Sequence, residues 1–257
     1  MTALPLAGKR VLVTRAAHQA GKLSEGLCAL GAEPVKVPVI EIRPPEDLAP
    51  LDRALRELSS YDWLILTSAN TVRALADRAA ALGLNLAAAA RFNVAAVGEV
   101  TAEAARQAGF AIALVPESYV AESLAKSLAG QTRGRKVLLA RAAVARDVIP
   151  HALRAAGATV DVVDAYRNVM PESAPALLRE ALQKGIAAAA FTSSSSVTHL
   201  ADAARQAGIA FPFAGVAAIS IGPVTSKTLR DLGWEPVAEA SPSDVPGLLR
   251  AIAHAVH

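Results

Sequence analysis

Hydroxyl-bearing and small residues follow short apolar runs at matching places in the two halves of the chain. Thr67–Asn70 follow one such run, and Thr192–Ser195 follow a similar run 125 residues later. Gly98–Thr101 and Gly222–Thr225 form a second pair, with a separation of 124 residues. If the runs are strands, these residues expose the first N–H groups of the next helices, which can bind a carboxylate or phosphate group. Ordinary helix capping by Ser, Thr and Asn is the alternative at any one of these places.

Two arginines add positive charge to the same pattern. Arg15 and Arg141 end the two copies of another apolar run, Val11–Thr14 and Val137–Ala140. A guanidinium group forms charge-assisted hydrogen bonds to acid groups. Because arginines and hydroxyl groups recur in both halves, we expect a ligand with many acid groups, held between two modules by many weak contacts.

Tyr166 is the candidate for acid–base chemistry. It lies in the extended segment 161–169, which corresponds by the repeat to the segment before Pro44. A phenol is protonated at pH 7 and can donate a proton to a leaving hydroxyl group. A strand tyrosine packed at a domain edge is the alternative.

Other common chemistries have no matching residues. Cys28 is the only cysteine, so no intramolecular disulfide or thiolate cluster is expected, and its place on a leucine-bearing helical face predicts a core position. The five histidines have no metal-ligand spacing, and a catalytic histidine brought into a site by folding is the alternative. The segment 222–227 has one glycine, which is too few for a P-loop. We therefore expect no metal site and no ATP or NAD.

Composition indicates a folded protein with two domains. The chain has 257 residues, 53% of them apolar and 19% charged, which excludes a disordered chain. A net charge of +3 without Lys/Arg runs, together with 4% aromatic residues, argues against nucleic acid as a partner. Because the first residues lack a signal-peptide pattern and no apolar stretch is long enough to span a membrane, we expect a cytoplasmic protein without membrane contact.

Strand-like runs alternate with segments of helical period from end to end, which is typical of parallel sheets covered by helices. Helices are expected between the strands, for example over residues 71–82 and 100–108. Pro34–Ile42 is interpreted as one extended strand, with a linker as the alternative. The other predicted strands cover residues 9–14, 63–67, 94–97, 111–115, 136–140, 159–169, 187–192, 216–221 and 235–238.

The second half of the sequence repeats the first. The matching runs and their flanking glycines, such as Gly31 with Gly157, keep an offset of 124 to 126 residues. A period this long indicates a duplicated domain-sized unit, because solenoid repeats have periods of about 20–50 residues. The sequence therefore predicts two similar α/β modules.

In their order and spacing, these pieces resemble the uroporphyrinogen-III synthases over nearly the whole chain. The matching segments are 11–15, 66–70, 97–101, 146–150, Tyr166, 191–195 and 221–225. The resemblance implies an α/β fold of two similar, flavodoxin-like parallel-sheet domains, built from a duplicated and swapped half and joined by a two-stranded linker with a cleft between them. The first domain would comprise residues 1–38 and 171–257, the second residues 45–164, and the linker strands residues 39–44 and 165–170.

The resemblance also implies a reaction. The family closes linear hydroxymethylbilane to uroporphyrinogen III, with loss of water and inversion of the last pyrrole ring, in tetrapyrrole biosynthesis. No cofactor is required, and Tyr166 matches the tyrosine proposed to help the hydroxyl group leave. The implied partner is a small polycarboxylate substrate, with transient handover from hydroxymethylbilane synthase, and a monomer is expected.

The candidate binding residues combine the repeat with the resemblance. Arg15, Ser68, Thr101, Arg146, Ser193 and Thr225 match positions expected to line the family's cleft. Asn70 and Arg141 depend mainly on the repeat, and Gly98, Thr192, Ser194 and Gly222 complete the set. One departure is that Ala217–Ala218 stand where some relatives have a basic residue.

Two other classes of protein remain open. A two-lobed protein that binds an acidic ligand without chemistry, or a sensor derived from the synthase, would share the fold. A flavodoxin-like flavin protein would need a phosphate loop near Thr14 and more aromatic residues than the chain has. Formation of the inverted product isomer would distinguish the enzyme from both.

Overall fold

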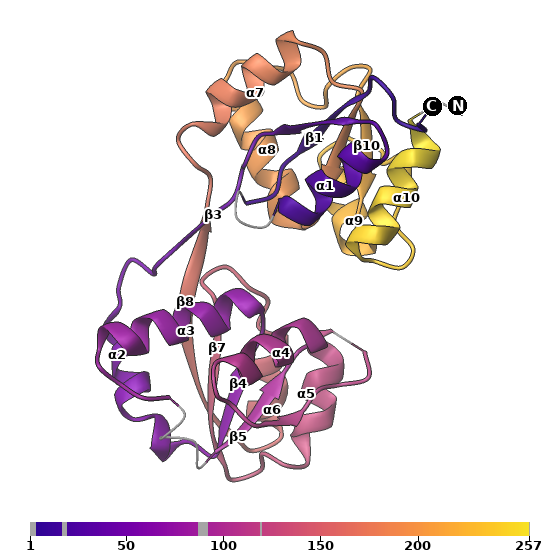
Figure 1. Ribbon diagram of the computed structural model, residues 1–257. Coiled ribbons are helices and arrows are strands. Elements are labelled where there is room, and N and C mark those ends of the chain that lie inside the picture. Colours follow the sequence, from indigo (N-terminus) through magenta and orange to yellow (C-terminus); the bar gives the residue numbers. More distant parts are fainter. Residues whose placement is uncertain (1–3, 17–19, 87–91, 119, 257) are drawn as a thin grey trace. The chain divides into compact units, whose positions relative to one another are not determined.

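The computed structural model describes residues 4–16, 20–86, 92–118 and 120–256 (Figure 1). The chain divides into two compact units. The terminal unit comprises Met1–Glu41 and Val169–His257, and the central unit comprises Ile42–Asn168. Each unit is built on one sheet with helices on both faces.

The terminal unit has a five-stranded parallel sheet in the order β11-β10-β9-β1-β2. Its strands are β1 (Arg10–Val13), β2 (Glu33–Lys36), β9 (Ala188–Phe191), β10 (Ala217–Ser220) and β11 (Ala238–Glu239). Helices α1 (Gly21–Ala29) and α10 (Val245–Ala255) cover one face, and α7 (Ala174–Gln183), α8 (Ser194–Gln206) and α9 (Pro223–Asp231) cover the other.

The central unit has a six-stranded sheet in the order β3-β8-β7-β4-β5-β6, with parallel pairing from β8 to β6. Its strands are β3 (Glu41–Arg43), β4 (Trp63–Leu66), β5 (Asn93–Ala96), β6 (Ile112–Leu114), β7 (Lys136–Ala142) and β8 (Thr159–Val169). Helices α2 (Ala49–Arg56), α3 (Ala69–Ala81) and α4 (Glu99–Gln107) cover one face, with the short η2 (Leu58–Ser60) beside them. Helices α5 (Ala121–Ala129) and α6 (Val148–Ala155) cover the other.

The two sheets have the same strand order once the repeat is taken into account. The terminal unit reads β2-β1-β9-β10-β11, and the central unit reads β8-β7-β4-β5-β6 with β3 added at the edge. The β1-α1-β2 segment therefore completes the sheet of the second half, and β7-α6-β8 completes the sheet of the first half. The predicted fold of two similar parallel-sheet modules with a swapped segment is confirmed.

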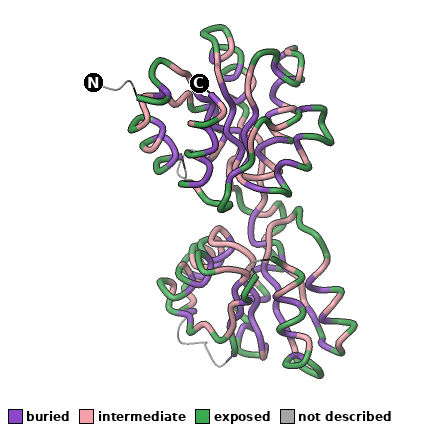
Figure 2. Tube along the Cα trace, turned by 90° about the vertical axis from the view of Figure 1, so that its right-hand side faces the viewer, coloured by how far each residue is buried: buried purple, intermediate pink, exposed green. Residues whose placement is uncertain are grey.

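Alternation of side chains along the strands builds the cores. In β1, Val11 and Val13 pack against α1 and α10, while Leu12 packs on the side of α7 and α8. Successive side chains of a strand point to opposite faces, so a continuous apolar run serves both helical layers. Figure 2 shows the buried residues following the strands within each unit.

Three local predictions were wrong. Pro34–Ile42 is not one strand, because β2 and β3 belong to different sheets and are separated by Pro38, which has no N–H to donate. The last strand begins at Ala238 rather than at residue 235, beyond Pro236. Cys28 is exposed rather than in the core, because the buried face of α1 is formed by Leu23, Ser24 and Leu27.

No helix in the described ranges has both the length and the apolar character needed to cross a membrane.

A two-pronged ion pair joins α2 to α3. Arg78 donates to both carboxylate oxygens of Asp52 at 2.6 Å, and the two side chains are 28% and 15% exposed. The hydrogen bond from Arg78 lowers the pKa of Asp52. A folded-state pKa below the unfolded value stabilises the fold above the unfolded pKa, and this contribution is lost as the pH falls through the folded pKa.

We therefore expect Asp52→Asn to lower the free energy of unfolding at pH 7. The difference in this free energy from the wild type should shrink as the pH falls toward about 3. Urea denaturation over this pH range measures the difference. Asp231→Asn is the control, because Asp231 pairs with Lys227 at an exposed surface and should contribute little. A deficit for Asp52→Asn that stays constant with pH would contradict this account of the pair.

Candidate active site

Ser68 begins helix α3 at the carboxyl end of β4. Its backbone is extended, and its Oγ accepts a hydrogen bond from the backbone N–H of Thr71 at 3.1 Å. Serine is favoured at this position because its side chain satisfies one N–H group of the first helical turn. Asn70 lies in the same turn, where its Oδ1 accepts a hydrogen bond from Arg73 at 3.3 Å.

Tyr166 reaches Ser68 from β8. The phenolic oxygen lies 3.2 Å from Ser68 Oγ, although the two residues are 98 positions apart in the chain. Strand β7 lies between β8 and β4, and it presents the small side chains of Ala140 and Ala142 at this end of the sheet. Tyr166 is only 7% exposed. The fold thus brings the predicted proton donor into contact with one of the predicted binding hydroxyls.

A bulge in β8 orients Tyr166. Arg141 pairs with Asp164 and Ala142 pairs with Tyr166, so Ala165 is an extra residue in β8. Because side chains alternate along a strand, one extra residue reverses the face to which the following side chains point. Ala165 and Tyr166 are both buried although they are adjacent, as expected at such a bulge.

The end of β5 carries the next pair of predicted residues. Gly98 is the N-cap of α4, and its carbonyl oxygen accepts hydrogen bonds from the N–H groups of Thr101 and Ala102 at 3.0 Å. A glycine brings no side chain over the first turn of the helix. Thr101 is 7% exposed and lies in the first turn of α4.

Arg141 and Arg146 are both paired with carboxylates of the central unit. Arg141 donates to Asp147 at 2.7 Å and to the carbonyl oxygen of Arg146 at 3.2 Å, and its side chain is 14% exposed. The hydrogen bond from Arg141 to Asp147 lowers the pKa of the Asp147 carboxyl group. Arg146 donates to Glu122 at 2.7 Å, and its side chain is 68% exposed. Arg141 therefore holds the loop that presents Arg146.

The terminal unit repeats the hydroxyl arrangement at the ends of β9 and β10. Ser193 is the N-cap of α8 and accepts a hydrogen bond from the N–H of Ser196 at 3.2 Å. Ser194 Oγ donates to the carbonyl oxygen of Val224 at 3.3 Å and accepts from Thr228 at 2.8 Å. These bonds tie the first turn of α8 to α9, whose N-cap is Gly222.

The remaining predicted residues of the terminal unit lie at the same edge of its sheet. Arg15 follows β1, which pairs with β9, and burial lowers the pKa of its guanidinium group. Thr192 is half-buried at the end of β9, and Thr225 is 4% exposed in the first turn of α9. The position that corresponds to Tyr166 by the repeat is Ile40, which has no hydroxyl.

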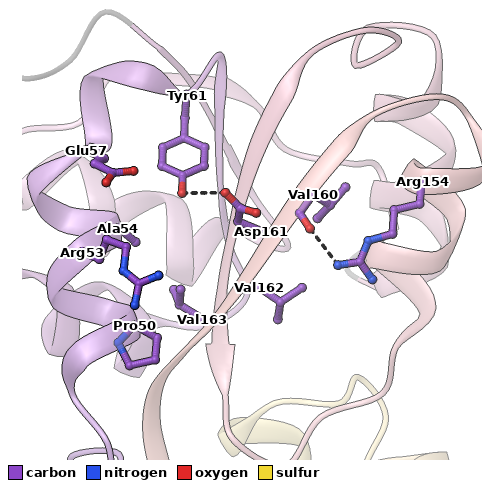
Figure 3. A pocket seen from close by; sticks show the side chains of 10 residues that line it. All are labelled: Pro50, Arg53, Ala54, Glu57, Tyr61, Arg154, Val160, Asp161, Val162 and Val163. Atoms are coloured by element: carbon purple, nitrogen blue, oxygen red, sulfur yellow. Dashed lines mark hydrogen bonds between the residues drawn. The ribbon is translucent and has the colours of Figure 1, made fainter.

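A cavity of about 460 Å³ in the central unit lies away from these strand ends (Figure 3). It runs along the first half of β8, between α2 and Arg154 of α6. Tyr61 donates to Asp161 at 2.8 Å, and Arg154 donates to the carbonyl oxygen of Val160 at 2.7 Å. Burial, followed by this bond to Asp161, raises the pKa of Tyr61. None of the predicted site residues lines this cavity.

Within the described part of the chain, no group of three or more His, Cys, Asp or Glu side chains could hold a metal ion.

Comparison with known proteins identifies the family. A family model described as "Uroporphyrinogen-III synthase HemD" matches residues 21–250. The chain belongs to this family. It is 35% identical over 257 residues to the uroporphyrinogen-III synthase of Synechococcus elongatus, covering 98% of this chain and 97% of that protein. A putative uroporphyrinogen-III synthase of Methanothermobacter thermautotrophicus is 31% identical over 229 residues, with 86% and 88% covered.

Solved uroporphyrinogen-III synthases share the fold. A mutant of the Thermus thermophilus protein matches with a TM-score of 0.67 and 23% identity, covering 96% of this chain and 98% of that one. The Helicobacter pylori protein matches with a TM-score of 0.64 and 17% identity, covering 94% and 96%. The resemblance noted in the sequence is therefore confirmed.

Sequence reasoning missed the buried hydroxyls behind the predicted synthase site. Thr71 and Ser196 are both fully buried and both lie three residues after an N-cap serine. Their matching places in the repeat were a signal that could have identified them. In the terminal unit alone, the fully buried Ser226 contacts Ser220 at 2.6 Å and donates to Glu239 at 2.5 Å. The residues at the corresponding places in the central unit, Ala96 and Ala102, have no hydroxyl.

We expect Ser68→Ala and Ser193→Ala each to lower the free energy of unfolding by about 1 kcal/mol, because each removes an N-cap hydrogen bond. Chemical denaturation measures both. Asp244→Ala removes the cap of α10, where Asp244 accepts from Gly247 N–H at 2.7 Å, and should cost a similar amount. If the Asp244 variant loses stability and the two serine variants do not, the capping role assigned to the serines is wrong.

Proposed function

We propose that this chain is a cyclising lyase that converts linear hydroxymethylbilane to uroporphyrinogen III, with loss of water and inversion of the last pyrrole ring. The observation that carries the proposal is the family match over residues 21–250. The contact between Tyr166 and Ser68 at a strand end supports it, because that is where open α/β sheets bind their ligands.

In this proposal, the carboxyl ends of both sheets bind carboxylates of the substrate. Hydroxyl groups and helix N-termini supply hydrogen bonds, and arginines supply charge. The proposed binding residues are Arg15, Ser68, Asn70, Gly98, Thr101, Arg146, Thr192, Ser193, Ser194, Gly222 and Thr225, and Arg141 supports them by holding the loop that presents Arg146. Their distribution over several strand ends suits a ligand with acid groups around its whole periphery.

Tyr166 is the proposed proton donor. The C–O bond of the hydroxymethyl group breaks, and the phenol gives its proton to the departing hydroxyl, which leaves as water. The substituted carbon of the last ring then attacks the carbon that carried the hydroxyl group, which gives a spiro intermediate. This intermediate reopens and recloses with the last ring inverted. Closure releases a proton, which restores the phenol. The net change is the loss of one water molecule, so the reaction needs no oxidant, reductant or cofactor.

Positioning would account for the product isomer. The linear substrate can close without inversion, so the protein must favour attack by the substituted carbon over attack by the free one. We also propose that the two compact units are the domains of the enzyme, and that it acts as a cytoplasmic monomer. Because the linear substrate is reactive, direct handover from hydroxymethylbilane synthase would limit its loss.

The test mixes the protein with freshly made hydroxymethylbilane, oxidises the products and separates porphyrin isomers I and III by chromatography. We expect mainly isomer III without any added cofactor. Tyr166→Phe should slow its formation by about 100-fold and shift the product toward isomer I, since general acids typically contribute that much or more.

Tyr61→Phe is the matched control. It removes a phenol of the same unit that bonds to Asp161 beside the cavity of Figure 3, and the rate should stay close to that of the wild type. Wild-type protein that yields only isomer I at the rate of the buffer would overturn the proposed activity. Equal rates for Tyr166→Phe and wild type would remove the role assigned to Tyr166 alone.

A further inference from the structure

A chain of hydroxyl groups leads from Tyr166 into the core of the central unit. Tyr166 contacts Ser68 Oγ at 3.2 Å, and Ser68 Oγ lies 3.0 Å from Thr71 Oγ1. Thr71 is fully buried in the first turn of α3. Its hydroxyl also lies 3.4 Å from Thr67 Oγ1, which donates to the carbonyl oxygen of Ala140 at 3.4 Å.

The buried hydroxyl of Thr71 lies near two other hydroxyl oxygens, at unequal distances. Hydroxyl hydrogen bonds are strongest at about 2.7–2.8 Å and weaken with distance, so Ser68 Oγ at 3.0 Å is a better acceptor than Thr67 Oγ1 at 3.4 Å. A buried donor left without an acceptor is costly. The opposite order, in which Ser68 donates to Thr71, would leave the Thr71 proton only the longer contact. Donation from Thr71 to Ser68 is therefore favoured.

This order fills both acceptor positions of Ser68. A hydroxyl oxygen has two lone pairs and one proton. The N–H of Thr71 takes one lone pair at 3.1 Å, and the hydroxyl of Thr71 takes the other. Ser68 can then engage Tyr166 only as a donor, so the phenolic proton of Tyr166 cannot be given to Ser68 and is directed elsewhere.

We infer that Thr71 is a positioning residue, whose hydroxyl makes Ser68 donate to Tyr166 and so keeps the phenolic proton available to the substrate. This inference rests on the proposed function of Tyr166. Thr71 acts through Ser68 and does not touch the reacting atoms.

The terminal unit lacks this arrangement, which gives an internal comparison. Ser196 occupies the place of Thr71 and is also fully buried, but its Oγ donates to the backbone oxygen of Ser193 at 2.6 Å. The Ser196 hydroxyl therefore occupies neither lone pair of the Ser193 hydroxyl. Ile40 takes the place that Tyr166 has in the other unit. Both units have a buried hydroxyl at this place. In the central unit, which has the phenol, it donates to the N-cap side chain, and in the terminal unit it donates to the N-cap backbone.

The experiment measures the rate of isomer III formation for Thr71→Val and Thr71→Ser. Valine keeps the shape of threonine and removes the hydroxyl, and serine keeps the hydroxyl. We expect Thr71→Val to lower kcat about tenfold, with KM within about twofold, and Thr71→Ser to recover most of the rate. In the Tyr166→Phe background, Thr71→Val should have no further effect on kcat, because it acts through the phenol.

Thr132→Val is the matched control. Thr132 is fully buried in the same unit, where its hydroxyl donates to the carbonyl oxygen of Leu128 at 3.0 Å, and it is not part of the proposed site. Thermal melting of both valine variants compares their stability. Thr132→Val should melt lower than the wild type and keep its kcat.

The outcomes separate the inference from the proposed activity. Wild-type protein without isomer III activity means that the proposed activity has failed. An active wild type and a slow Tyr166→Phe, with Thr71→Val as fast as the wild type, overturn the role of Thr71. The same conclusion follows if Thr71→Val and Thr132→Val lose equal activity, or if Thr71→Val still lowers kcat in the Tyr166→Phe background.

Discussion

The pairing of β7 with its two neighbours fixes the geometry on which the proposed site depends. Leu66 of β4 pairs with Ala140, and Tyr166 of β8 pairs with Ala142, so Tyr166 lies across β7 from the end of β4. The bulge at Ala165 then sets the face to which Tyr166 points. A shift of one residue in this register would turn the phenol away from Ser68, because side chains alternate along a strand. The small side chains of β7 at this end leave room for the contact.

The two units share a duplicated architecture and differ in particular side chains. Both units have the same strand order, serine N-caps after the equivalent strands β4 and β9, and glycine N-caps after β5 and β10. The central unit adds the phenol of Tyr166, whereas the terminal unit adds the buried Ser220–Ser226 pair next to Glu239. The shared features are those proposed to bind anions, and the features that differ are hydroxyl contacts that would orient particular protons. This division suits a reaction in which many contacts bind and few groups take part in chemistry.

Elements with strong local signals could be predicted from the sequence. The bounds of β8 were predicted correctly, because β-branched and aromatic residues recur along Thr159–Val169 and no glycine or proline interrupts them. Ser68 and Ser193 could be placed at helix starts because serine has a local reason to be there. The bulge at Ala165 could not be predicted, since it depends on pairing with β7 rather than on local residue types. The pairing of Arg141 with Asp147 also depends on how the loop 143–147 folds back.

The arginines show why residue type alone does not define a binding role. Arg141 is mostly buried, and its contacts to Asp147 and to the backbone of Arg146 hold the loop together. Moving Arg141 to a ligand would break both contacts and remove its support of this loop, which opposes its transfer to a ligand. The pair of Arg146 with Glu122 is exposed on both sides, and water screens such pairs, so exchanging Glu122 for a substrate carboxylate costs little. Of the two arginines, Arg146 is therefore the one suited to bind the substrate. Arg141 is suited to hold the loop that carries Arg146.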